Sequence, residues 1–355
     1  MRLCVKKGFI TLHLLRTTTL VLAIAGILYG VLWALVATGL RDLSLTWIND
    51  QRGQGWAIAH DAPLIHGFPR WPKVAMTNVS VSAPETIGMW TWRIEALQLI
   101  PNNLNLTGLT INAPGRHTFH WLTSMGEIWT LQTLKTTLGI DLDIDGRWRN
   151  AMLTMENAEL SDPLNRPLTG VARLDARLAV SKTDVPNGSF GEQAFVRFSG
   201  SADDFRVAIT LGPFANLVRT ARFDADLVGP IQAGRIPEAL DAWRRGGGTV
   251  EVKRLFLDWP PLIVDADGTL ALDNRLQPIG AFSTRITGLK EILATMHSRG
   301  IIDSVQASSA QIILGLMANT AQDGEPELSV PVSIQNQHLS IGPLDLIPVP
   351  ELRWK

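Results

Sequence analysis

The hydrophobic positions of five segments alternate as in a β-strand and then change parity in the same way. Residues 104–111 read LNLTGLTI, with apolar side chains at Leu104 and Leu106 and, after two intervening residues, at Leu109 and Ile111. The spacing recurs in four further sets: Val74, Met76, Val79 and Val81; Trp92, Ile94, Leu97 and Leu99; Leu153, Met155, Ala158 and Leu160; and Val250, Val252, Leu255 and Leu257. Because strand side chains alternate between two faces, a regular strand cannot change parity.

Two local structures explain such a change. An extra residue in a strand forms a β-bulge, which bends the strand and increases its twist. Alternatively, the two-residue gap is a turn between short strands, which the pair Thr107 and Gly108 would permit. The gaps in the other sets are less turn-like, so we favour bends over turns. Bends at matched positions of neighbouring strands would curl the whole sheet.

The remaining pattern predicts further strands and three helices. Clean alternation of apolar and polar residues, as at residues 174–180, is typical of antiparallel strands with one covered face. Helical spacing with glycine or polar ends predicts helices near residues 236–246, 289–299 and 304–319. Between the first two helices, residues 249–288 read as a three-stranded meander.

An uncharged apolar run extends from Thr17 to Leu40, which meets the roughly 20 residues that a helix needs to cross a bilayer. The basic residues Arg2, Lys6, Lys7 and Arg16 precede it. This charge distribution predicts a cytoplasmic N-terminus and an exported remainder. A cleaved signal peptide is the alternative, with residues 37–39 as a weak cleavage site, although its apolar region is normally shorter.

The apolar run also predicts which surface of the helix contacts another membrane helix and how the chain is divided into domains. Gly26, Gly30 and Ala34 form a stripe of small residues on which another membrane helix can pack closely. Trp47 and Trp56 follow the run, where indoles favour the bilayer interface. We expect a basic cytoplasmic arm at residues 1–16, a transmembrane anchor at 17–40 and a juxtamembrane helix at 41–55. A periplasmic β-rich domain follows at residues 56–355, with a possible sub-boundary near 230–248.

The predicted fold class is therefore mainly β with a few helices (α+β): an N-terminal transmembrane helix, then a curled, elongated antiparallel sheet with bulged strands. The sequence Gly67-Phe68-Pro69, followed by Trp71 and Pro72, predicts a rigid turn that packs Phe68 and Trp71 against this sheet, with a ligand gate as the alternative.

Composition and motifs narrow the function. The net charge of −1 argues against nucleic acid as a partner, and a single cysteine, Cys4, allows neither an intrachain disulfide nor a thiolate metal cluster. His117 and His120 are three residues apart, which suits a metal on a helix but not on a strand. No nucleophile elbow, phosphate loop or dinucleotide fingerprint is present. We therefore expect no catalytic residue, metal or cofactor.

Several short motifs resemble those of a known family. They are Gly55-Trp56, Gly67-Phe68-Pro69, the segment LDWPPLIVDADGTLALD at 257–273 with QPIG at 277–280, and the tail at residues 330–352. Together they resemble an uncharacterised alphaproteobacterial envelope family, domain of unknown function 2125. That family is similar to the AsmA-like inner-membrane proteins, which are thought to hold lipid acyl chains in a β-sheet groove. The resemblance implies a groove and a location in the bacterial inner membrane.

The combined expectation is an inner-membrane-anchored periplasmic protein that binds or transfers phospholipid or other apolar molecules in envelope homeostasis. A non-enzymatic assembly or scaffold factor, whose sheet edge pairs with a protein partner, is the alternative. The apolar groove candidates are the slipped positions Val79, Val81, Trp92, Ile94, Leu97, Leu99, Leu104, Leu106, Leu109, Ile111, Leu255 and Leu257. Whether such an interior is open or filled by its own side chains is not decided by the pattern.

Overall fold

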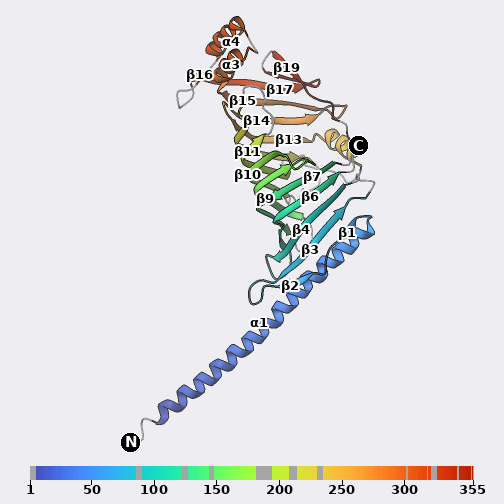
Figure 1. Ribbon diagram of the computed structural model, residues 1–355, viewed down its shortest axis with the longest axis vertical. Coiled ribbons are helices and arrows are strands. Elements are labelled where there is room, and N and C mark those ends of the chain that lie inside the picture. The colour runs from blue at the N-terminus through green and yellow to red at the C-terminus, as the bar shows by residue number, and fades with distance from the viewer. Residues whose placement is uncertain are drawn as a thin grey trace. The chain divides into compact units, whose positions relative to one another are not determined.

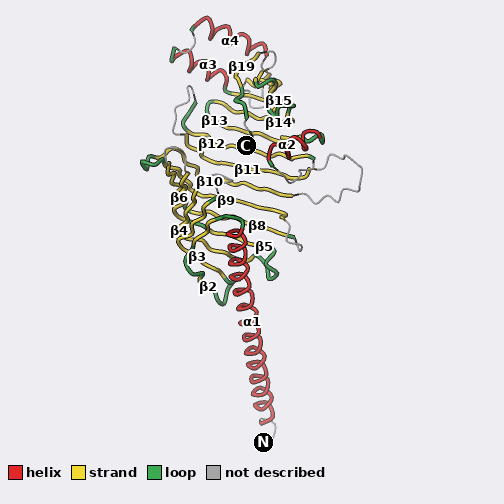
Figure 2. Tube along the Cα trace, turned by 90° about the vertical axis from the view of Figure 1, so that its right-hand side faces the viewer, coloured by secondary structure: helices red, strands yellow, loops and turns green. Residues whose placement is uncertain are grey.

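The computed structural model describes most of the chain as two compact units (Figures 1 and 2). The described residues are 5–84, 90–121, 127–143, 148–180, 194–207, 214–229, 235–300, 303–317, 319–320, 326–341, 344–352 and 354. Unit 1 comprises residues 1–113 and 119–126, and unit 2 comprises residues 114–118 and 127–355. Strand β6 (Gly115–Trp121) contributes residues to both units.

Unit 1 combines one long helix with short antiparallel strands. Its elements are α1 (Val5–Gly53), β1 (Ala57–Ala59), β2 (Leu64–His66), β3 (Lys73–Ser82), β4 (Trp90–Pro101) and β5 (Gly108–Asn112). β1 pairs with the end of β3 and β2 with its beginning, so the two share one edge of that strand. β4 pairs with the other edge of β3 and continues the sheet to β5.

Helix α1 is continuous over 49 residues. Within the described chain, its segment Thr18–Gly53 is the one helix long and apolar enough to cross a membrane. Most side chains from residue 18 to 35 are exposed, whereas Val36, Ala37, Leu40 and Ile48 are buried. The predicted anchor and juxtamembrane helix are therefore two parts of one helix, and burial begins at Val36.

Unit 2 is a long antiparallel meander with three helices. Its strands are β7 (Glu127–Thr133), β8 (Lys135–Leu142), β9 (Trp148–Ser161), β10 (Pro167–Val180), β11 (Ala194–Val207), β12 (Leu217–Val228), β13 (Thr249–Trp259), β14 (Leu262–Leu272), β15 (Pro278–Thr287), β16 (Asn319–Thr320), β17 (Pro326–Gln335), β18 (His338–Ile341) and β19 (Leu344–Pro348). The helices are α2 (Ile236–Arg245), α3 (Leu289–Ser298) and α4 (Ser304–Met317). The fold class and all three predicted helices are confirmed.

Successive strands of unit 2 are neighbours in space. β9 pairs with β10, and the ladder continues through β11, β12, β13, β14 and β15 to β17 and β18. β12 and β13, which flank the sub-boundary predicted near residues 230–248, are paired with each other, so the sheet continues across it. Local pairing in sequence order is the arrangement expected of hairpins and meanders.

Four of the five parity changes are bends within continuous strands, as predicted. β3, β4, β9 and β13 each pass through the change without ending. In β3 and β9 the gap contains an asparagine with positive φ, 51° at Asn78 and 48° at Asn157. Asparagine enters the left-handed region more readily than most residues. One residue in that conformation turns the following side chains to the other face of the strand.

The bends of the neighbouring strands β3 and β4 are matched, whereas that of β13 is not. β3 and β4 keep one register on both sides of the change, with Thr77 opposite Ala96 and Val79 opposite Ile94. In β13 the register with β14 shifts by one residue between Val252 and Leu255, which is a β-bulge. Because the bends of β3 and β4 coincide, the side chains of both strands change faces together and the strands stay paired.

The fifth parity change, in LNLTGLTI, is a turn, so the bend interpretation is wrong there. β4 ends at Pro101 and β5 begins at Gly108, which leaves Leu104 and Leu106 in the connecting turn. Leu106 has a positive φ of 57°. The Asn103 side chain accepts a hydrogen bond from the Thr107 backbone N–H at 3.0 Å, which holds the turn closed.

Replacement of Asn157 tests the left-handed conformation inside β9. Asn157→Val should lower the free energy of unfolding by about 1–2 kcal/mol relative to Asn157→Gly, because a β-branched residue is strained at positive φ. Both variants remove the same exposed amide group, so the difference between their free energies of unfolding reports the backbone strain at residue 157. The measurement is chemical denaturation of the purified full-length protein. Equal stability of the two variants would contradict the bend as described.

Candidate apolar-ligand surface

The predicted groove candidates of unit 1 form its hydrophobic core. Nine of them belong to one cluster, either buried or packed against it: Val79, Val81, Trp92, Ile94, Leu97, Leu99, Leu106, Leu109 and Ile111. The cluster also contains Leu40 and Ile48 of α1. α1 contacts β1, β2 and β3, and Figure 1 shows its C-terminal part beside these strands. The helix therefore covers the apolar side of this small sheet.

Because α1 covers the sheet, side chains of the protein itself fill the interior of unit 1. Val79, Ile94 and Leu99 are at most 7% exposed, as expected of core residues that pack against other side chains. Leu104, in the β4–β5 turn, is 57% exposed and lies outside the cluster. Of the first ten candidates, three are buried, six are half-buried against the cluster, and Leu104 alone is exposed.

Unit 2 presents an apolar sheet face of a different kind. We define the open apolar face as Leu153, Leu174, Leu178, Phe198, Phe223 and Leu255, on β9 to β13. Strand register places them on one side: Leu178 lies opposite Phe198, and Phe223 lies opposite Leu255. Phe198, Phe223 and Leu255 are 40%, 41% and 41% exposed. Figure 2 shows these strands side by side, and no described helix makes an extensive contact with them.

Small residues lie between the large ones on this face. One row across the five strands reads Leu153, Ala176, Gly200, Phe223 and Leu255. A Cβ atom added at Gly200 would meet no heavy atom closer than 3.5 Å, so the space above this position is free. Leucine and phenylalanine side chains flanking small residues can contact an apolar chain laid along the row.

Sequence reasoning found part of this face and missed the rest. Leu255 and the half-buried Leu257 were candidates because β13 carries the parity change. Phe198 and Phe223 were missed because their strands alternate without a slip. The signal was nevertheless present, since Phe198, Gly200 and Ala202 share one parity, and so do Ala221, Phe223 and Ala225.

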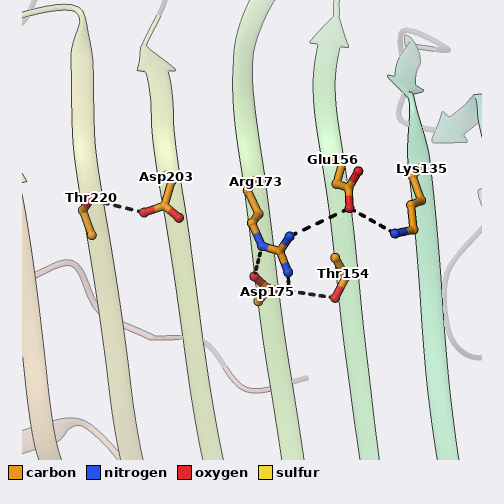
Figure 3. A network of polar contacts seen from close by, with 7 residues as sticks. All are labelled: Lys135, Thr154, Glu156, Arg173, Asp175, Asp203 and Thr220. Carbon is orange, nitrogen blue, oxygen red and sulfur yellow. Dashed lines mark hydrogen bonds and ion pairs between the residues drawn. The ribbon is translucent and has the colours of Figure 1, made fainter.

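The opposite face of the same strands is polar and internally paired (Figure 3). Glu156 accepts from Lys135 at 3.1 Å and lies 3.8 Å from Arg173, whose Nε donates to Asp175 at 2.6 Å. The Thr154 hydroxyl donates to Asp175 at 2.7 Å. Many charges of this face are therefore paired within the sheet, whereas the row from Leu153 to Leu255 carries no charged residue.

A depression of about 410 Å³ is lined mostly by residues of this polar face. Its lining combines the charged residues Asp175, Arg177, Arg222, Asp224 and Arg254 with Met152, two serines, and Ala176, Gly200 and Phe223 of the row described above. Arg254 also pairs with Asp265 at 3.3 Å. Such a lining suits water or ions better than hydrocarbon, because burying unpaired charge against an apolar group is costly.

The anchor helix carries the second predicted site. A Cβ added at Gly26 or Gly30 would meet nothing within 4 Å, and Ala34 is exposed. In the described chain this stripe therefore contacts no other element, and the predicted membrane-helix partner stays a prediction. Across the described residues of the whole chain, no group of three or more histidine, cysteine or acidic side chains could hold a metal ion.

A protein-family match covers most of the chain. The family model described as "Uncharacterized protein conserved in bacteria (DUF2125)" matches residues 33–350. The chain belongs to the DUF2125 family. The match includes both the part of α1 that packs on the unit 1 sheet and the whole open apolar face. No curated protein matches the sequence significantly. The similarity to AsmA-like proteins stays a prediction.

The polar face of this DUF2125 protein also predicts a pH dependence. Arg197 donates to both oxygens of Asp226 at 2.7 and 2.8 Å, and the Asp226 side chain is 6% exposed. These hydrogen bonds lower the pKa of Asp226 below its ordinary 3.8. A lowered folded-state pKa adds stability above the unfolded value, and this stability is lost as pH falls through the folded value.

Arg197→Met should therefore reduce the free energy of unfolding at about pH 7 by about 1–2 kcal/mol, because a buried carboxylate loses its partner. The loss should shrink as the pH falls below the ordinary carboxyl pKa of 3.8 and then through the lowered pKa of folded Asp226. Denaturation of both proteins across this pH range is the measurement. Arg177→Met is the control, since Arg177 bonds the neutral Asn150. A pH-independent loss would refute the assignment.

Proposed function

We propose that this protein is anchored in the bacterial inner membrane by α1 and binds a lipid acyl chain, or a similar apolar molecule, on the open apolar face of unit 2. The observation that carries the proposal is the contrast between two apolar sheet faces of one chain. The face in unit 1 is covered by Leu40 and Ile48 of α1. The face in unit 2 keeps two phenylalanines and a leucine about 40% exposed.

Exposed apolar side chains in a contiguous row mark interaction surfaces, because their burial is favourable and water contact is not. Each methylene group transferred from water to such a surface contributes about 0.8 kcal/mol when fully buried. The row from Leu153 to Leu255 crosses five strands, about 19 Å at the usual strand spacing of about 4.8 Å. That length accommodates a large part of an acyl chain.

Charge supports the proposed orientation. Arg2, Lys6, Lys7 and Arg16 precede the apolar run, and residues 17–40 carry no charge. Basic residues are retained on the cytoplasmic side of a membrane helix. Under the proposal, the DUF2125 sheet therefore lies in the periplasm, where apolar molecules must be shielded from water during movement. The proposed role is binding or transfer rather than catalysis.

Photocrosslinking in cells tests the ligand class. A benzophenone amino acid at Phe223 of the full-length chain should yield adducts of lipid mass after irradiation, because this side chain is proposed to touch the ligand. The control position is Leu164, which is 72% exposed in a turn of the same unit. Lipid adducts at position 223 but not at 164 are expected. Protein adducts in place of lipid would favour the scaffold alternative and overturn the proposal.

A charged substitution on the face should weaken binding. With the crosslinker at Phe198, Phe223→Asp should reduce the lipid adduct severalfold, because a carboxylate beside an acyl chain is poorly solvated. Leu164→Asp removes an equally apolar exposed side chain and should leave the yield unchanged. Thermal denaturation verifies that both variants fold. An undiminished adduct in a folded Phe223→Asp variant would place the ligand elsewhere.

A further inference from the structure

The β2–β3 loop, residues 67–72, packs against the apolar part of α1. The prediction that it places Phe68 and Trp71 against the sheet is wrong. The Phe68 ring lies 5.5 Å from Trp33 in an edge-on arrangement and 6.2 Å from Tyr29. Phe68 and Trp71 remain 60% and 46% exposed. Two large aromatic side chains of the sheet domain are therefore open to the surroundings beside the candidate membrane helix.

Three backbone carbonyl groups and one N–H group of this loop have hydrogen-bond partners. The Tyr29 hydroxyl donates to the Pro69 carbonyl, and the Trp33 indole N–H donates to the Arg70 carbonyl at 2.6 Å. The Arg70 N–H donates to the Gly67 carbonyl at 2.8 Å, and the prolines at 69 and 72 have no N–H. Satisfied backbone groups are the condition for placing a non-helical segment near hydrocarbon.

The loop is also held in a fixed conformation. Gly67 has a φ of 115°, and a Cβ at this position would lie 2.4 Å from the Trp71 carbonyl oxygen. Only glycine allows the chain to close here. The exposure of Phe68 and Trp71 is thus a consequence of a tightly built turn that directs them away from the core.

Burial along α1 indicates where lipid ends and protein begins. Most side chains from residue 18 to 35 are exposed, while Val36, Ala37 and Leu40 are covered by the protein itself. A helix surface covered by its own sheet cannot also face acyl chains. The lipid-facing part of the helix on this side therefore ends near Tyr29 and Trp33, at the level of the β2–β3 loop.

We propose that the β2–β3 loop is a second membrane contact, in which Phe68 and Trp71 insert into the interfacial region of the bilayer beside Tyr29 and Trp33. This rests on the anchoring by α1 proposed above, but not on lipid binding by unit 2. Tyrosine and tryptophan favour the headgroup level, and the exposed Arg70 suits contact with lipid phosphates. The unit 1 sheet then sits directly on the membrane surface.

Helix geometry is consistent with this level. A 20-residue span that ends at Trp33 begins at Leu14, and it is about 30 Å long, the thickness of the hydrocarbon core. Arg16 then lies in its first turn, where long basic side chains are tolerated. Trp47 is about 21 Å further along the helix than Trp33 and lies outside the bilayer. Trp56 packs against the unit 1 core and Trp90 instead.

Depth-dependent fluorescence quenching tests the contact in the full-length chain. In a Cys4→Ser background, single cysteines at Phe68 and Trp71 are labelled with an environment-sensitive fluorophore. The protein is reconstituted in two sets of vesicles of phosphatidylethanolamine and phosphatidylglycerol, one containing a lipid brominated near the headgroup, which probes positions 47, 68 and 71, and one containing a lipid brominated near the acyl-chain end, which probes position 24. Ile24, exposed on the apolar run, is the embedded reference, and Trp47, 58% exposed on the same helix, is the external one.

We expect the labels at 68 and 71 to be quenched severalfold more strongly than the label at 47. If both resemble position 47 while Ile24 is quenched, the chain is anchored but the loop stands clear of the bilayer, and the inference fails alone. If Ile24 is also unquenched, the anchoring fails and the inference fails with it. Lipid crosslinking at Phe223 reports on unit 2 separately.

Discussion

The packing of the second half of α1 on the sheet of unit 1 is the interaction on which the rest of this structure depends. Leu40 and Ile48 enter the same core as Val74, Met76 and Val79. Burial of side chains of this size stabilises a fold by about 1.5–3 kcal/mol each. Because α1 is unbroken from Val5 to Gly53, the helix segment that is apolar on all sides is rigidly joined to the segment that covers the sheet.

This continuity gives the two halves of one helix different surroundings. A helix that is hydrophobic all round requires lipid or a protein interior, whereas an amphipathic helix requires one apolar surface. The change at Val36 marks the transition between these requirements. The β2–β3 loop lies just before it, and its aromatic side chains share the exposed surroundings of Tyr29 and Trp33. The anchor, the β2–β3 loop and the sheet of unit 1 thus pack together at the proposed membrane surface.

The strands of unit 2 have the same alternation of apolar and polar residues, but no described helix covers their apolar face. The meander separates an ion-paired polar face from an apolar face in which alanine and glycine lie between leucine and phenylalanine. The polar side chains of Figure 3 bond one another, in part across strands. The apolar face is incomplete among the described residues, and this asymmetry is the basis for assigning ligand binding to it.

The local pattern was sufficient for the strands, the helices and four of the five bends. Alternation reports which side chains share a face, and an asparagine inside the gap, as at Asn78 and Asn157, is a local signal for the left-handed residue that changes the face. The turn in LNLTGLTI was only the less favoured alternative, because a turn and a bend have the same spacing and only strand pairing separates them.

Family membership and the apolar run of the helix could likewise be recognised from residues alone. Whether an apolar face is core or surface could not, because that depends on which distant element covers it. Leu97 and Leu255 both occupy the third position of the slipped pattern. Leu97 is half-buried against the core that contains Leu40 and Ile48 of α1, whereas Leu255 is 41% exposed on a sheet face that no described helix covers. Sequence determines the side on which a residue points, and only the tertiary structure decides what meets it there.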